Sequence, residues 1–162
     1  MWKAMVVTLG VWAALPAVAG LVESIPDKVC PTLLNLGLEG REWQEGAGGF
    51  SCTSDRVAFE PTNSTLSFSA AGDVTQVAQV LLVLDMPSLP GSSQEFSLRN
   101  ILGAAASDMA VKVLGAPLSS EARKVIADGV APTMFVVGSG SVYMTRVDTP
   151  DGQGYALQLL LK

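Results

Sequence analysis

The feature that most constrains the fold is a helical apolar pattern in the middle of the chain, with strand-like patterns on both sides of it. Between Ser92 and about Leu114 the apolar residues recur at intervals of three and four, which predicts one buried helix face. The residues on this face are Leu98, Ile101, Leu102, Ala105, Met109 and Val113. Ser92 with Glu95 has the form of a capping box, and Gly115 followed by Pro117 predicts the end of the helix.

Two further helices are predicted, one directly after this helix and one near the start of the chain. Ser119 is placed to cap the beginning of the second central helix, and Gly129 is placed to close its end. Residues 26–38 predict a short N-terminal helix, with Asp27 as a cap and Pro31 near the first turn. Helices are therefore expected in two places, one at the start and a pair in the centre.

The remaining segments alternate between apolar and polar residues, as half-buried strands do. They are residues 50–53, 55–60 and 65–70 before the central helices, and 134–137, 142–147 and 155–161 after them. The segment from Val74 to Leu84 fits a helix by its spacing, but its valines and the tight turn before it favour a strand. Residues 159–161 are apolar on both faces, which favours a central strand over one that pairs with another protein.

The order of helix, strands, two helices and strands predicts an α+β domain. Short turns such as Ala71-Gly72-Asp73 join consecutive strands and favour antiparallel pairing. We therefore predict an antiparallel sheet of about five to six strands, with one N-terminal helix and a central pair of helices packed on one face.

The first nineteen residues have the three parts of a secretory signal peptide. Lys3 precedes an apolar run, and the small residues Ala17 and Ala19 stand where a signal peptidase requires them. We predict cleavage between Ala19 and Gly20, so that residues 1–19 are a cleavable signal peptide and 20–162 a single periplasmic or secreted domain. An uncleaved anchor is the alternative, but the apolar run is shorter than the roughly 20 residues that span a bilayer, so no stable membrane anchor is expected after cleavage.

Two cysteines follow the predicted cleavage point, Cys30 and Cys52. In an oxidising compartment such a pair predicts a disulfide bond. Redox catalysis is the alternative, but catalytic dithiols are usually Cys-x-x-Cys, and twenty-one residues separate these two. With both cysteines paired and no histidine in the chain, no zinc site, other metal site or cofactor is expected.

The chain contains no histidine, which removes the most common general base and every Ser-His or Cys-His nucleophile. Its fifteen acids would permit hydrolysis by a carboxylate pair, but no pair stands out. Residues 138–141, Gly-Ser-Gly-Ser, lack the context of a nucleophile elbow or a phosphate loop and predict a hairpin turn. Residues 148–152 likewise predict a hairpin turn in preference to a calcium loop. We therefore predict no catalytic residues and no enzymatic activity.

Charge limits the partners. Removal of residues 1–19 takes Lys3 from the ten bases and none of the fifteen acids, which leaves nine bases and a net charge of −6. Nucleic acid is therefore not an expected partner, because phosphate binding requires clustered bases. Residues 41–49 predict a polar, glycine-rich connection in which Trp43 is a candidate partner contact, although packing against the core is equally compatible with the sequence.

These observations predict an exported, non-enzymatic domain that binds a protein or ligand in an accessory, chaperone-like or inhibitor role. A small carboxylate-dependent hydrolase and a subunit of an envelope assembly are the alternatives. The sequence names neither the partner nor the oligomeric state.

Overall fold

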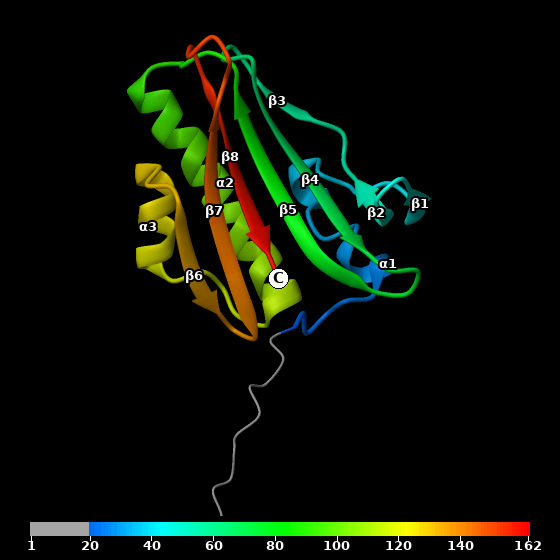
Figure 1. Cartoon of the computed structure of the whole chain (residues 1–162). Coiled ribbons are helices and arrows are strands. Elements are labelled where there is room, and N and C mark those ends of the chain that lie inside the picture. Colours follow the sequence, from blue (N-terminus) through cyan, green and yellow to red (C-terminus); the bar gives the residue numbers. More distant parts are fainter. Residues whose placement is uncertain (1–19) are drawn as a thin grey trace, which may run out of the picture.

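A single antiparallel sheet of eight strands organises residues 20–162, the part of the chain that this computed structural model describes (Figure 1). The strands are β1 (Gln44–Gly46), β2 (Gly49–Thr53), β3 (Val57–Phe59), β4 (Ser64–Gly72), β5 (Val77–Met86), β6 (Thr133–Val137), β7 (Gly140–Asp148) and β8 (Tyr155–Leu161). The helices are α1 (Pro26–Val29), α2 (Ser92–Leu114) and α3 (Ser120–Asp128), with a 3₁₀ turn η1 (Leu34–Leu36). Neighbouring strands follow the order β1-β2-β4-β5-β8-β7-β6, and β3 pairs with the part of β4 that β2 leaves free.

The predicted α+β class and antiparallel sheet are confirmed, whereas the predicted number of five to six strands is too small. One additional strand is β1, which lies in residues 41–49, where the sequence predicts only a connection. All three residues of β1 are exposed, so no alternation of apolar and polar residues marks it in the sequence. It is a strand because its backbone pairs antiparallel with β2, from Gln44 opposite Ser51 to Gly46 opposite Gly49.

The centre of the sheet is formed by β5 and β8. Leu82 stands opposite Leu159 and Leu84 opposite Leu157, and all four side chains are fully buried. The prediction of a strand over residues 74–84 is confirmed from Val77 onward, whereas residues 74–76 belong to the turn after β4, and β5 extends to Met86. The prediction of a central last strand is also confirmed, because β8 lies between β5 and β7.

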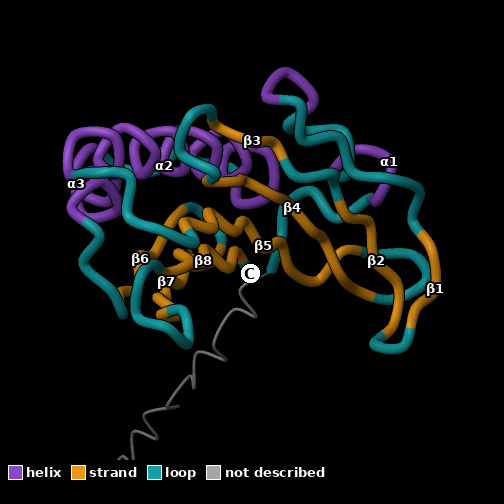
Figure 2. Tube along the Cα trace, turned by 90° about the horizontal axis from the view of Figure 1, so that it is seen from above, coloured by secondary structure: helices purple, strands orange, loops and turns teal. Residues whose placement is uncertain are grey.

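The two central helices lie on one side of this sheet (Figure 2). α2 packs against β5 and β8, and α3 packs against α2. The predicted cap of α3 is confirmed, since the Ser119 Oγ accepts a hydrogen bond from the Ala122 N–H at 3.0 Å. The capping box predicted at Ser92 is wrong: Gly91 occupies the cap position with φ 102°, and Glu95 bonds to Arg99 instead.

The N-terminal helix predicted over residues 26–38 is also wrong in extent. α1 is a single turn that ends at Val29, and η1 follows after a break. Pro31 accounts for the break, because it has no N–H to donate to the carbonyl of Asp27. Gly37 then reverses the chain with φ 75°, so that Leu38 pairs with Leu33 in an isolated bridge.

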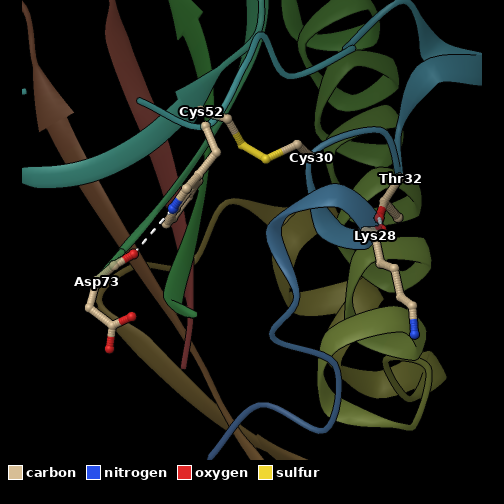
Figure 3. Close-up of a disulfide and its surroundings, with 6 residues drawn as sticks. Lys28, Cys30, Thr32, Cys52 and Asp73 are labelled. Carbon is tan, nitrogen blue, oxygen red and sulfur yellow. Dashed lines mark hydrogen bonds between the residues drawn. A yellow bond between two sulfur atoms is a disulfide. The ribbon is translucent and has the colours of Figure 1, made fainter. Parts of the chain in front are cut away.

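The predicted Cys30–Cys52 disulfide is confirmed, and it joins the end of α1 to β2 (Figure 3). Cys30 is only 6% exposed and Cys52 only 1%. A Cβ atom on Gly40 would lie 2.8 Å from the Cys30 carbonyl oxygen and 3.1 Å from the Cys52 Sγ. The chain therefore passes directly against the disulfide, and glycine is required there.

Within residues 20–162, no helix combines the length and the apolar character that crossing a bilayer requires.

Candidate functional site

The candidate site lies at the β6 end of the sheet. β6 pairs with β7 from Thr133 opposite Met144 to Val137 opposite Gly140. It is the last strand in the order of the sheet, so no other described strand pairs with its outer edge. A strand edge of this kind presents backbone N–H and C=O groups that can pair with another chain.

The side chains of β6 make this edge apolar. The strand reads Thr-Met-Phe-Val-Val and contains no charged residue. Met134 is 53% exposed and Val136 is 79% exposed. Met134 stands opposite Tyr143 and Val136 opposite Ser141. Tyr143 and Ser141 alternate with the buried residues of β7, so all four side chains lie on the face of the sheet that carries no described helix. Soluble proteins usually protect exposed edge strands with charge, and β6 lacks that protection.

A groove of about 440 Å³ runs between β6 and α3. Val125 and Ala122 of α3 line it on one side, and Phe135 and Val137 of β6 line it on the other. Glu121 is the one charged residue among the described residues that line it. The strand edge and the groove therefore form one continuous surface that carries a single charged side chain, Glu121, among apolar residues and the hydroxyls of Ser119 and Thr133.

Hydrogen bonds at the two ends of α3 hold the helix beside β6. Ser119 caps its beginning, and Gly129 ends it in the left-handed conformation with φ 71°. The Arg99 Nε of α2 donates to the carbonyl of Ala127 at 2.6 Å. The Thr133 hydroxyl, at the start of β6, donates to the carbonyl of Val130. The walls of the groove are therefore fixed partly by Ser119 and Thr133, which line it, and partly by Arg99, which does not.

A polar cluster lies behind the groove, between α2 and β8. The Arg99 Nη1 lies 2.5 Å from the Glu95 Oε1 and 2.8 Å from the Tyr155 hydroxyl, and that hydroxyl donates to Glu95. The guanidinium of Arg146 lies 3.8 Å from the centroid of the Tyr155 ring. Burial, followed by the hydrogen bond to Glu95, raises the pKa of the Tyr155 phenol above its ordinary value.

This cluster has the residue types of a catalytic site but is occupied by its own contacts. Tyr155 is only 1% exposed, and the carboxylate of Glu95 is engaged by both Arg99 and Tyr155. Because Arg99 also bonds to α3, the cluster ties α2, α3 and β8 together. We interpret it as the structural support of the groove.

Three acidic side chains line one hollow of the surface. This hollow of about 430 Å³ is lined by Glu39, Glu42 and Asp55, but all three are exposed and Asp55 pairs with Arg41. A general acid that works near neutral pH normally needs burial or a close negative neighbour. Within residues 20–162, no group of three potential metal-ligating side chains occurs.

The two turns that the sequence singles out are hairpin turns. Gly138 and Ser139 join β6 to β7, and the turn before β8 is closed by Asp151, which accepts hydrogen bonds from the Thr149 hydroxyl and the Gln153 N–H. These two hydrogen bonds lower the pKa of the Asp151 carboxyl, and the bond from Thr149 has the larger effect. The Asp148 carboxylate pairs with Arg146 at 2.7 Å.

Trp43, the candidate partner contact, lies just before β1 and is half-buried. Its ring stacks on Phe50 with centroids 6.5 Å apart, and its Nε1 donates to the Asp73 carbonyl at 3.1 Å, the bond marked in Figure 3. Its role as a partner contact stays a prediction. Of the predicted cleavage residues, Ala19 lies outside the described residues, and the carbonyl of Gly20 accepts a bond from the Ser139 hydroxyl at 2.7 Å.

The β6 groove was not predicted from the sequence. The sequence shows that residues 130–137 contain no charge, but residues 61–72 and 152–161 contain none either, so this feature does not mark β6. Comparisons of the chain with protein-family models, with curated proteins and with solved structures find no match. The groove is therefore identified by the geometry of this chain alone.

Proposed function

We propose that this chain is an exported, non-enzymatic binding domain that takes up an extended segment of a partner protein along β6. The observation that carries the proposal is the free, uncharged edge of β6 beside the α3 groove. Export is supported by the signal-like first nineteen residues together with the buried disulfide.

Binding of this kind has a simple physical basis. A segment added to β6 would form backbone hydrogen bonds with the free edge, which provide affinity without regard to sequence. Its alternate side chains would point to opposite faces of the enlarged sheet. One set would enter the groove beside Phe135 and Val125, and the other would cover Met134 and Val136. Burial of these apolar side chains stabilises the complex by about 25 cal/mol per Å² before the cost of association.

The test uses a panel of extended peptides and the exchange of backbone amide hydrogens in residues 133–137. We expect peptides that bind to slow exchange in β6. Val136→Lys should abolish this protection, because a charged side chain on the strand blocks pairing at an edge. Val74→Lys is the matched control, since Val74 is 64% exposed in the turn between β4 and β5, at the other side of the sheet. Peptides that bind but leave β6 unprotected would contradict the proposal.

A further inference from the structure

We infer that the segment bound along β6 is apolar and carries a lysine or arginine opposite Glu121. This inference rests on the proposed function and adds the chemical class of the partner. It is carried by the position of one carboxylate in a groove that is otherwise uncharged among the described residues.

Glu121 stands at one end of the groove. It lies in the first turn of α3, and Val125 follows one turn later on the same side of the helix. The groove at that end is also lined by Pro117 and Gly138, which places the carboxylate beside the end of β6. A bound strand would therefore meet apolar side chains along most of its length and a negative charge near Val137.

The carboxylate of Glu121 is available for an ion pair. The five ion pairs formed by described residues do not include it, and its side chain is exposed. A glutamate in the first helical turn also interacts favourably with the helix dipole. That interaction explains a glutamate at this position in the helix, but it leaves the negative charge of the groove without a counterion.

The charge of the chain favours a basic partner over a second copy of the protein. The chain has a net charge of −5, and antiparallel pairing of β6 with β6 of another copy would bring two such negatively charged chains together. An acidic segment would meet the same repulsion. A segment with lysine or arginine gains attraction both from Glu121 and from the whole domain.

The experiment compares three labelled ten-residue peptides of alternating valine and threonine that differ at one position, which is lysine, glutamine or glutamate. Binding of each peptide to the domain of residues 20–162 is measured by fluorescence anisotropy at low salt. We expect the lysine peptide to bind about fivefold more tightly than the glutamine peptide, which is the most that one exposed ion pair provides, and the glutamate peptide to bind most weakly. The preference should fall to about twofold with Glu121→Gln and should reverse with Glu121→Lys.

Glu45→Gln is the matched control, because it removes the same charge from an exposed position on β1 at the opposite edge of the sheet. It should leave the preference of about fivefold for the lysine peptide unchanged. Glu121 also stabilises α3 through the helix dipole, and this effect does not depend on the peptide. A melting curve of each variant without peptide measures it separately from binding.

Each other outcome has a definite meaning. Equal binding of the lysine and glutamine peptides, lost with Val136→Lys, would overturn the inference about Glu121 and leave the proposed function in place. Binding that Val136→Lys does not change, or no binding of any peptide, would overturn both. A concentration-dependent dimer that protects residues 133–137 from amide exchange would identify a second copy as the occupant and would also overturn the inference.

Discussion

The two edges of the sheet differ in the way they meet solvent. At one edge, β1 is three residues long, polar, and carries Glu45. At the other, β6 is five residues long, without charge, and exposes Met134 and Val136. A short charged edge strand is a common protection against pairing with other chains, and a longer apolar one is a common place for it. The strand β1 is therefore protected against pairing with other chains, whereas β6 is available.

The support behind the two edges differs as well. The β1 edge is held by covalent and aromatic contacts, namely the disulfide and the stacking of Trp43 on Phe50. The β6 edge is held through the polar cluster that links α2 to α3 and β8. A loss of support at one edge should therefore leave the other edge largely intact, and the following predictions test this separation.

The largest expected effect is the loss of the disulfide. Cys30→Ser combined with Cys52→Ser should lower the free energy of unfolding by about 3 kcal/mol, because the crosslink closes a loop of about 20 residues. Amide exchange should accelerate in β1, β2 and β3 more than in β6. Chemical denaturation and exchange measured on the same variant check both statements. An equal acceleration at both edges would contradict the separation.

The next effect concerns the support of the groove. Tyr155→Phe removes the hydroxyl that bonds to Glu95 and Arg99 in a buried setting, and should cost about 2 kcal/mol, as hydrogen bonds to charged groups do. Exchange should accelerate in α3 and β6, and hardly in β1. Tyr143→Phe is the control, because Tyr143 lies on the open face of β7, and its cost should stay within about 0.5 kcal/mol. Similar costs for both variants would exclude the proposed role of the cluster.

A third change makes the protected edge resemble the open one. Gln44→Val combined with Glu45→Val removes the charge and the polar character of β1. Stability should change by less than about 1 kcal/mol because both side chains are exposed, but self-association should appear at concentrations where the wild type is unaffected. Sedimentation velocity at several concentrations measures this. No added association would show that the length of β1, and not its charge, protects the edge.

The smallest expected effect is a pH dependence of stability that comes from Asp73, in the turn between β4 and β5. Backbone N–H groups of Thr75 and Gln76 donate to Asp73 and lower the pKa of its carboxyl below the ordinary value of about 4. Because the folded-state pKa is the lower one, the stabilisation is present above about pH 4 and is lost as the pH falls through the folded value. Asp73→Asn should therefore make unfolding less dependent on pH in this range, as thermal melts between pH 2 and 6 would show. The corresponding Asp148→Asn variant, on β7, should not remove this dependence.

The sequence predicts those elements in which the buried residues recur at the regular spacing of a strand or a helix. The strand of residues 65–70 and the long α2 are such cases, since alternate residues of β4 and one face of α2 are buried. The disulfide could be predicted because the chain has two cysteines and a signal-like start that indicates an oxidising compartment. β1 could not be predicted, because its three residues face solvent and carry no period. The break in the first helix depends on one missing N–H at Pro31, which a pattern of apolar residues does not register.

The candidate site could not be predicted in this way. Its walls come from α3 and from β6, and each of them has an ordinary pattern of its own. The position of α3 depends on contacts between residues far apart in the chain, such as the bond from Arg99 to the Ala127 carbonyl, 28 positions away, and the packing of the buried Ile126. Only the absence of charge from residues 130–137 is visible in the sequence, and it does not say what lies beside that strand.

The hairpin turn between β6 and β7 holds both Gly20 and Lys162. Ser139 bonds to the carbonyl of Gly20, and Ser141 exchanges two backbone hydrogen bonds with Lys162. Gly138 of the same turn lines the groove, so a tag or fluorophore attached at Gly20 or Lys162 would lie next to a bound strand. A circular permutant, with these two residues joined by a short linker and new termini opened in the exposed turn at Asp151, would move such labels to the opposite end of the sheet.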